Sequence, residues 1–158
     1  MKKFLLPFLF ILVFIATESC KKKDACDNVS CNGGGVCVDG TCQCDSLHEG
    51  TNCETDKRAK YFGSFVGNAN CTSLNHLDYL KITAVSDSAN QLNFHNLYGS
   101  ERNIVGIIFS DGSVYIPEQV SGLDTISGSA SINNGKVVVN YTAKYPGGTD
   151  VCSWMQKW

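Results

Sequence analysis

Residues 125–145 read TISGSASINNGKVVVNYTAKY, and this stretch decides the fold of the C-terminal part of the chain. Its two halves, residues 125–132 and 136–145, alternate apolar and polar side chains with a period of two, which is the period of a β-strand that buries one face. Between them, NNG at residues 133–135 is a strong signal for a tight hairpin turn. The stretch therefore predicts a pair of antiparallel strands.

Segments of the same kind occur on both sides of this hairpin. They alternate or carry short apolar runs, and turn residues separate them at intervals that are typical of an all-β sandwich or barrel. The segments are residues 61–67, 79–85, 91–97, 103–109, 114–120 and 150–158. No helical period of useful length accompanies them. We therefore expect a mostly β chain in which residues 61–158 form an antiparallel domain of about eight strands.

Two isolated cysteines indicate how this domain closes. Cys71 follows the first expected strand, and Cys152 lies in the last. A disulfide Cys71–Cys152 would join the two ends of the domain, and the first and last strands of an up-and-down meander meet only when the sheet closes on itself. The pair therefore favours an up-and-down β-barrel, and a β-sandwich is the alternative.

The inward-facing positions of such a barrel are apolar. The candidates for lining it are Ile82, Phe94, Ile108, Val137, Val139 and Tyr141. The interior of an eight-stranded barrel is wide enough to be filled by side chains or to hold one small ligand, so both a packed core and a ligand cavity are open. The opening Gly63-Ser64-Phe65 resembles the G-x-W start of lipocalin-like barrels, which implies a carrier of a small apolar ligand.

Six of the nine cysteines fall within residues 26–53, with the spacing C-x4-C-x5-C-x4-C-x-C-x8-C. The segment has too few apolar residues for a core, and modules of this size usually need disulfides or a metal. Spacing alone allows fifteen pairings of six cysteines. A zinc site is disfavoured, because paired C-x2-C knuckles are missing.

This segment resembles an epidermal growth factor (EGF)-like module. The resemblance is carried by the single residue between Cys42 and Cys44, by GGVC at residues 34–37 and by the ending Gly50-x-x-Cys53. It implies a module over residues 26–54 with one pairing of the cysteines: Cys26–Cys37, Cys31–Cys42 and Cys44–Cys53. Residues 55–60 are charged and are predicted to be a linker.

The module departs from the family pattern at two places. Leu47 and His48 stand where the family usually has a glycine and an aromatic residue. Calcium-binding members carry an acidic run ahead of the first cysteine, whereas residues 22–25 read KKDA here. We therefore predict no calcium site, and no other metal or cofactor.

The N-terminus has the pattern of an export signal. Lys2 and Lys3 precede the apolar residues 4–16, a run of thirteen that is shorter than the roughly 20 residues of a membrane-spanning helix. The small residue Ser19 followed by Cys20 resembles the lipobox of Bacteroidetes-type lipoproteins, although Glu18 departs from strict versions. The resemblance implies a signal peptide over residues 1–19.

The same resemblance implies a lipid anchor. Cys20 would become the mature N-terminus, residues 20–25 a lipidated tether, and the protein a lipoprotein of the outer membrane of a Gram-negative bacterium. Lipidation of Cys20 leaves eight cysteines, an even number that can pair. The alternative is a secreted protein whose Cys20 is an unpaired thiol.

Little in the sequence points to catalysis or to nucleic acid. The chain has 13 basic and 15 acidic residues and no basic stripe, which excludes a nucleic-acid footprint. None of its histidines lies at metal-ligand or catalytic spacing; His48 is expected in a turn of the module, His76 in an exposed loop and His95 opposite Phe94. We therefore predict that the chain is not an enzyme.

The expected function is that of a non-enzymatic, lipid-anchored cell-envelope protein. Acyl chains on Cys20 would hold it on the membrane, the EGF-like module would be a spacer or a protein contact, and the β domain would be structural or bind a protein or glycan. The β domain also resembles β-rich C-terminal domains of Bacteroidetes lipoproteins, through IPEQ at residues 116–119 and ISGSASINNG at 126–135. That resemblance implies no activity. The alternative function is the lipocalin-like carrier.

Overall fold

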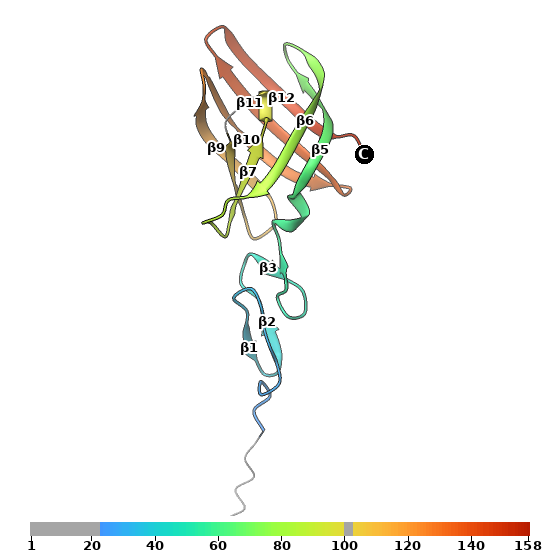
Figure 1. The fold of residues 1–158 in the computed structure, drawn as a ribbon, viewed down its shortest axis with the longest axis vertical. Helices are drawn as coiled ribbons and strands as arrows, with labels where there is room; N and C mark the ends of the chain where they lie inside the picture. The colour runs from blue at the N-terminus through green and yellow to red at the C-terminus, as the bar shows by residue number, and fades with distance from the viewer. Residues whose placement is uncertain (1–22, 100–102) are drawn as a thin grey trace, which may run out of the picture.

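The computed structural model describes residues 23–99 and 103–158, so the predictions for residues 1–19 and for Cys20 lie outside the described residues. The chain folds into two parts that follow one another along the longest axis of the molecule (Figure 1). We call residues 24–57 the cysteine module and residues 61–156 the barrel. Within the described ranges, no helix is long and apolar enough to cross a membrane.

The barrel is a closed, antiparallel, eight-stranded sheet. Each strand pairs with the next along the chain, and the last, β12, pairs with the first, β5. The strands are β5 (Gly63–Cys71), β6 (Asn75–Ala84), β7 (Gln91–His95), β8 (Ile104–Ile108), β9 (Val114–Ser121), β10 (Asp124–Asn133), β11 (Lys136–Tyr145) and β12 (Gly148–Gln156). The predicted up-and-down barrel is confirmed, and the alternative of a sandwich is wrong.

The hairpin predicted for residues 125–145 is formed by β10 and β11. Asn133 pairs with Lys136, so that Asn134 and Gly135 make a two-residue loop. Both loop residues have positive φ, 50° and 75°. Positive φ at both positions is the requirement of a type I′ turn, whose twist matches that of the strands it joins, and Asn-Gly satisfies it with little strain.

The inside of the barrel is apolar. The six candidates for lining it are all at most 3 % exposed: Ile82, Phe94, Ile108, Val137, Val139 and Tyr141. The largest buried side chain, Trp154, lies over Gly67, where a Cβ atom would overlap the indole ring. Cys71 and Cys152 are directly opposite in the β5–β12 register and form a disulfide.

Strand β9 contains a bulge that accommodates its proline. The β9–β10 register shifts between Ile126 and Gly128, opposite Pro117, and a proline inside a sheet is tolerated at such a bulge because it has no N–H to donate. On the side of β9 that faces β8, the Gln119 side chain takes part in the pairing. Its Oε1 accepts from the Val105 N–H (2.9 Å), and its Nε2 donates to the Val105 carbonyl (2.8 Å). One amide side chain thus takes the place of a backbone pair between β8 and β9.

The cysteine module consists of two small ladders. Strands β1 (Val36–Val38) and β2 (Thr41–Gln43) pair with each other, as do β3 (His48–Glu49) and β4 (Thr55–Asp56). Three disulfides hold it, and they join the cysteines that the EGF-like resemblance pairs: Cys26–Cys37, Cys31–Cys42 and Cys44–Cys53.

Two segments differ from the sequence-based expectations. Residues 55–60, predicted as a linker, contain β4 and the start of the 3-10 helix η1 (Ala59–Tyr61). His76, expected in an exposed loop, lies in β6, because that strand begins four residues before the alternating run at residue 79. His48 and His95 lie in β3 and β7, and His95 follows the buried Phe94 and faces the opposite way.

Candidate functional site at the two ends of the barrel

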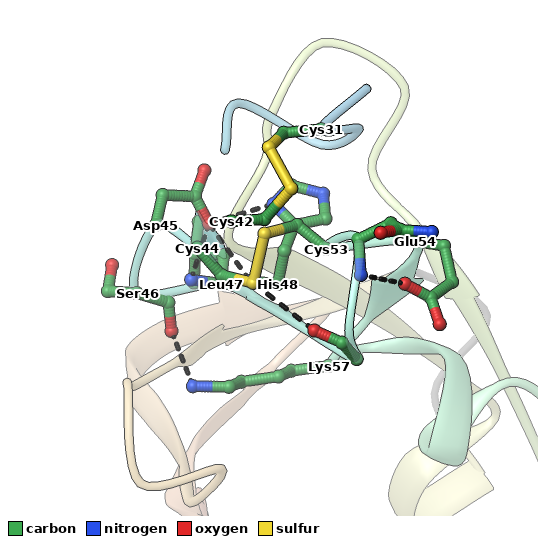
Figure 2. The surroundings of a disulfide bond; sticks show 12 residues. Cys31, Cys42, Cys44, Asp45, Ser46, Leu47, His48, Cys53, Glu54 and Lys57 are labelled. Atoms are coloured by element: carbon green, nitrogen blue, oxygen red, sulfur yellow. Dashed lines mark hydrogen bonds and ion pairs between the residues drawn. A yellow bond between two sulfur atoms is a disulfide. The ribbon is translucent and has the colours of Figure 1, made fainter. Parts of the chain in front are cut away.

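One end of the barrel, the near end, is joined to the cysteine module by Lys57. Its Nζ donates to the Ser46 carbonyl in the module and to the Ser110 carbonyl in the β8–β9 turn, each at 2.8 Å. Its backbone N–H donates to the Leu47 carbonyl at 3.0 Å. Figure 2 shows the side chain of Lys57 extending towards Ser46 near the Cys44–Cys53 disulfide. One ammonium group therefore connects the module to the barrel.

Arg58 makes a second connection at the near end. Its Nη1 donates to the carbonyls of Ser88 and Gln91, where β6 passes to β7, while Nε and Nη2 bind the Asp56 carboxylate. Desolvation by itself would raise the pKa of Asp56, but the hydrogen bonds from Arg58 outweigh it and leave this pKa below its usual value. The ion pair with Asp56 holds the Arg58 guanidinium group against the β6–β7 turn.

Apolar contacts complete this end. Leu47, which stands where the EGF-like pattern usually has a glycine, packs against the barrel core. Tyr61 is fully buried, and its hydroxyl donates to the Gly112 carbonyl at 2.7 Å. Desolvation raises the pKa of Tyr61 to about 12. Leu47 of the module and Tyr61 of the following 3-10 helix therefore both pack at the near end of the barrel.

The opposite end, the far end, is held together by Asp150. This residue is only 2 % exposed. Its Oδ1 accepts from Thr72 Oγ1 (2.9 Å) and the Ser73 N–H (3.0 Å), and its Oδ2 accepts from Ser73 Oγ (2.6 Å) and Tyr98 Oη (2.8 Å). These donors, Ser73 foremost, lower the pKa of Asp150. The carboxylate thus ties the β5–β6 turn and the segment after β7 to β12.

Tyr98 reaches Asp150 from the 3-10 helix η2 (Leu97–Gly99). Its φ is 59°, a value in the left-handed region that non-glycine residues seldom adopt. Its ring packs edge-to-face on Tyr141, with 6.1 Å between ring centroids. Desolvation, followed by the hydrogen bond to Asp150, raises the pKa of Tyr98 to about 12. The tyrosine is therefore a neutral donor over the whole physiological range.

A cleft of about 260 Å³ lies beside this network, lined by Ser73, His76, Tyr98 and Asp150 among others. Serine, histidine and aspartate share it, but they are not arranged for nucleophilic catalysis. Ser73 Oγ donates directly to the carboxylate of Asp150, and His76 Nε2 is 3.9 Å from Asp78. A nucleophile needs a general base within hydrogen-bond reach, and Ser73 has a carboxylate partner in place of an imidazole.

Metal chemistry is not supported at the far end either. The Sγ atoms of Cys71 and Cys152 lie within 4.8 Å of an Asp150 oxygen and of each other. Both sulfurs belong to one disulfide, and thiolates rather than disulfide sulfurs are the metal ligands. In the part of the chain that the structure describes, this was the single group of ligating residues dense enough to hold an ion.

Asp150 was not predicted as a site residue, although the sequence around it indicates a buried acid. In DVCSW, residues 150, 152 and 154 share one face of a strand, and two of them are among the buried core residues. An aspartate on the inner face of an otherwise apolar strand indicates a carboxylate with buried hydrogen-bond partners.

Comparison of the chain with protein-family models, curated proteins and solved structures finds no match.

Proposed function

We propose that the chain is a non-enzymatic, lipid-anchored protein of the cell envelope, in which an EGF-like module holds a closed β-barrel away from the membrane. Three features of the sequence support it: the apolar segment of residues 4–16, Cys20 four residues after its end, and the even number of cysteines that follow. All eight of those cysteines are paired in disulfides, which agrees with an oxidising, exported compartment.

The observation that carries the proposal is the joint at the near end. Because Lys57 and Arg58 bind carbonyls of two barrel turns and Leu47 packs on the core, the module is a rigid extension of the barrel and is not flexibly tethered to it. The chain enters the module at the end remote from the barrel (Figure 1). An anchor at Cys20 would therefore present the far end, with Asp150 and Tyr98, away from the membrane.

Acyl chains account for firm attachment in this proposal. Each buried CH₂ contributes about 0.8 kcal/mol, and two or more chains anchor a protein far more firmly than one. The proposed partner is a macromolecule of the envelope that contacts the far end or the outer face of the barrel.

The anchor is tested by expressing the full chain in a Gram-negative bacterium that is fed an alkyne-bearing fatty acid. We expect the wild-type protein in the membrane fraction and labelled at one site, and the Cys20→Ser variant without label. Cys152→Ser is the matched control, because it removes a different cysteine and should keep the label. A wild-type chain that carries no label would contradict the proposal.

The second candidate function is the carrier of a small apolar ligand. The closed eight-stranded barrel favours it, and so does Trp154, whose buried Nε1–H has no hydrogen-bond partner among the described residues. A ligand with a carbonyl or carboxylate inside the barrel would satisfy that donor. The side chains that line the interior are packed together, so such a ligand requires them to move.

This candidate is tested by fluorescence. In a Trp158→Phe variant, the remaining tryptophan is Trp154, and 12-bromododecanoate quenches an indole only on close contact. Saturable quenching would support a carrier, whereas emission unchanged by the bromolipid would exclude this class of ligand from the interior.

A further inference from the structure

A hollow of about 430 Å³ lies on the outer surface of the barrel, across β5, β6 and β7. It is distinct from the interior, the joint and the far end. Its lining residues include Ser64, Val66, Tyr79, Lys81, His95 and Asn96. Clefts of this size that combine apolar walls with a few polar groups are the usual form of small-molecule sites.

The wall of the hollow is apolar. Val66 and Tyr79 are directly opposite in the β5–β6 register, and strand alternation turns both away from the core that Leu80 and Ile82 enter. Tyr79 is 65 % exposed. The two side chains together offer an aromatic face beside a branched aliphatic group, which suits a flat apolar molecule.

The polar side of the hollow carries an unpaired positive charge. Lys81 lies between Ser64 on β5 and His95 on β7 in the sheet register. Within the described residues, its ammonium group makes no hydrogen bond or ion pair. His95 Nε2 is 2.9 Å from Thr83 Oγ1, which fixes the ring beside the lysine.

The neighbouring carboxylate does not neutralise this charge. Asp78 accepts hydrogen bonds from the Tyr79 N–H (2.8 Å) and from Asn96 Nδ2 (3.1 Å), and alternation along β6 places it on the face opposite Lys81. The hollow thus offers an apolar wall and one unpaired cation, with Tyr79 and Lys81 two residues apart on the same face of β6.

We propose that this hollow is a binding site for a small aromatic or aliphatic molecule that carries one anionic group. The apolar body lies against Val66 and Tyr79, and its carboxylate or sulfonate contacts Lys81. The apolar wall supplies the affinity, while the lysine fixes the orientation and discriminates against neutral analogues. The site does not depend on the lipid anchor, so either proposal can fail without the other.

Two probes that share a naphthalene body separate the contributions of the wall and of the charge. Naphthalene-2-sulfonate and the neutral 2-naphthalenemethanol are titrated into the purified full chain, and backbone amide shifts are followed by NMR. The expected result is a saturable shift confined to residues 64–66, 79–81 and 95–96 with both probes, and tighter binding of the sulfonate. Shifts that never saturate, or that map to other residues, would overturn the proposal.

The variants assign the roles. Lys81→Gln should weaken sulfonate binding two- to fivefold, the size of an exposed charge contact, and leave the alcohol unchanged. Tyr79→Ser should weaken both probes, and Tyr115→Ser, which alters a similarly exposed tyrosine on β9, should weaken neither. Equal loss of both probes in Lys81→Gln would refute the anionic ligand class. Amide signals outside the hollow report that each variant is folded.

Discussion

Tyr98 Oη donates a hydrogen bond of 2.8 Å to Asp150 Oδ2, and so joins the segment after β7 to the last strand, 52 residues further along the chain. Thr72 and Ser73 bind the same carboxylate from the β5–β6 turn. The buried carboxylate of Asp150 thus links three segments of the chain at the far end of the barrel. Because each carboxylate oxygen of Asp150 already accepts two hydrogen bonds, the role of this group is structural.

Removing the Tyr98 hydroxyl should destabilise the barrel. A hydrogen bond to a charged acceptor contributes about 1.5–3 kcal/mol, and Tyr98→Phe loses one while keeping the ring on Tyr141. We expect a fall of that size in the free energy of unfolding, measured by urea denaturation. Tyr115→Phe is the control, because its hydroxyl has no partner among the described residues and its loss should change nothing measurable. Equal stability of the two variants would contradict the role of Asp150.

The depressed pKa of Asp150 makes stability depend on pH. A carboxyl whose folded pKa lies below its unfolded value contributes stability that is present above the unfolded pKa and is lost as pH falls through the folded pKa. We therefore expect the melting temperature to fall on acidification below about pH 4, where an unperturbed Asp begins to protonate. In Asp150→Asn, the melting temperature at pH 7 should be lower and its fall towards acid shallower. A parallel pH profile would show that other carboxylates dominate, Asp45 and Asp56 being the first to test.

The Cys71–Cys152 disulfide should be the largest single contribution to barrel stability. It closes a loop with a sequence separation of 81, and the chain-entropy model gives about 4.5 kcal/mol for a loop of this length. The double variant Cys71→Ser/Cys152→Ser should unfold at a much lower urea concentration, with the three module disulfides intact by mass. A midpoint equal to that of the wild type would mean that the β5–β12 pairing needs no covalent support.

Gln119 should contribute more to stability than its half-buried position on β9 indicates. Its amide serves the N–H and the carbonyl of Val105, and leaving partly buried backbone groups unpaired costs about 1–3 kcal/mol. We expect Gln119→Ala to lose that amount by urea denaturation. Glu118→Ala, one residue away, breaks only an exposed ion pair with Lys144 and should cost less than 1 kcal/mol. A reversal of this order would contradict the role assigned to the bulge.

The joint predicts that the module and the barrel tumble together. Lys57→Met removes the hydrogen bonds to Ser46 and Ser110, each of which contributes about 1–2 kcal/mol at most at a partly exposed site. We expect the rotational correlation time of the module, from ¹⁵N relaxation, to equal that of the barrel in the wild type and to fall in the variant. Lys144→Met is the matched surface control. Independent tumbling in the wild type would contradict the rigid joint.

Local patterns were sufficient for much of the fold. Alternation in 125–132 and 136–145 with Asn134-Gly135 between them fixed the β10–β11 hairpin, since side-chain period and turn chemistry are both local properties. The position of Cys71 and Cys152 at opposite ends of the domain favoured closure, because a covalent link between first and last strands is hard to satisfy in an open meander.

Long-range polar contacts could not be predicted in the same way. Residues 55–60 are mostly charged and have no periodicity, so they resembled a linker. Lys57 and Arg58 acquire their roles only when the turns at residues 88–91 and 110 are brought beside them. Asp150 similarly needs Ser73 and Tyr98, which are 77 and 52 residues distant. His76 was predicted in a loop although it lies in β6. The outward face of that strand carries the apolar residues Leu77 and Tyr79, and they obscured the alternation of polar and apolar residues at its start.

The intact mass of the membrane-extracted chain tests most directly whether the protein is lipid-anchored and held by four disulfides. We predict the mass of residues 20–158 plus acyl chains, which rises on reduction by two hydrogens for each of the four disulfides. A lipid-free mass that retains Cys20 as a free thiol would contradict the anchor.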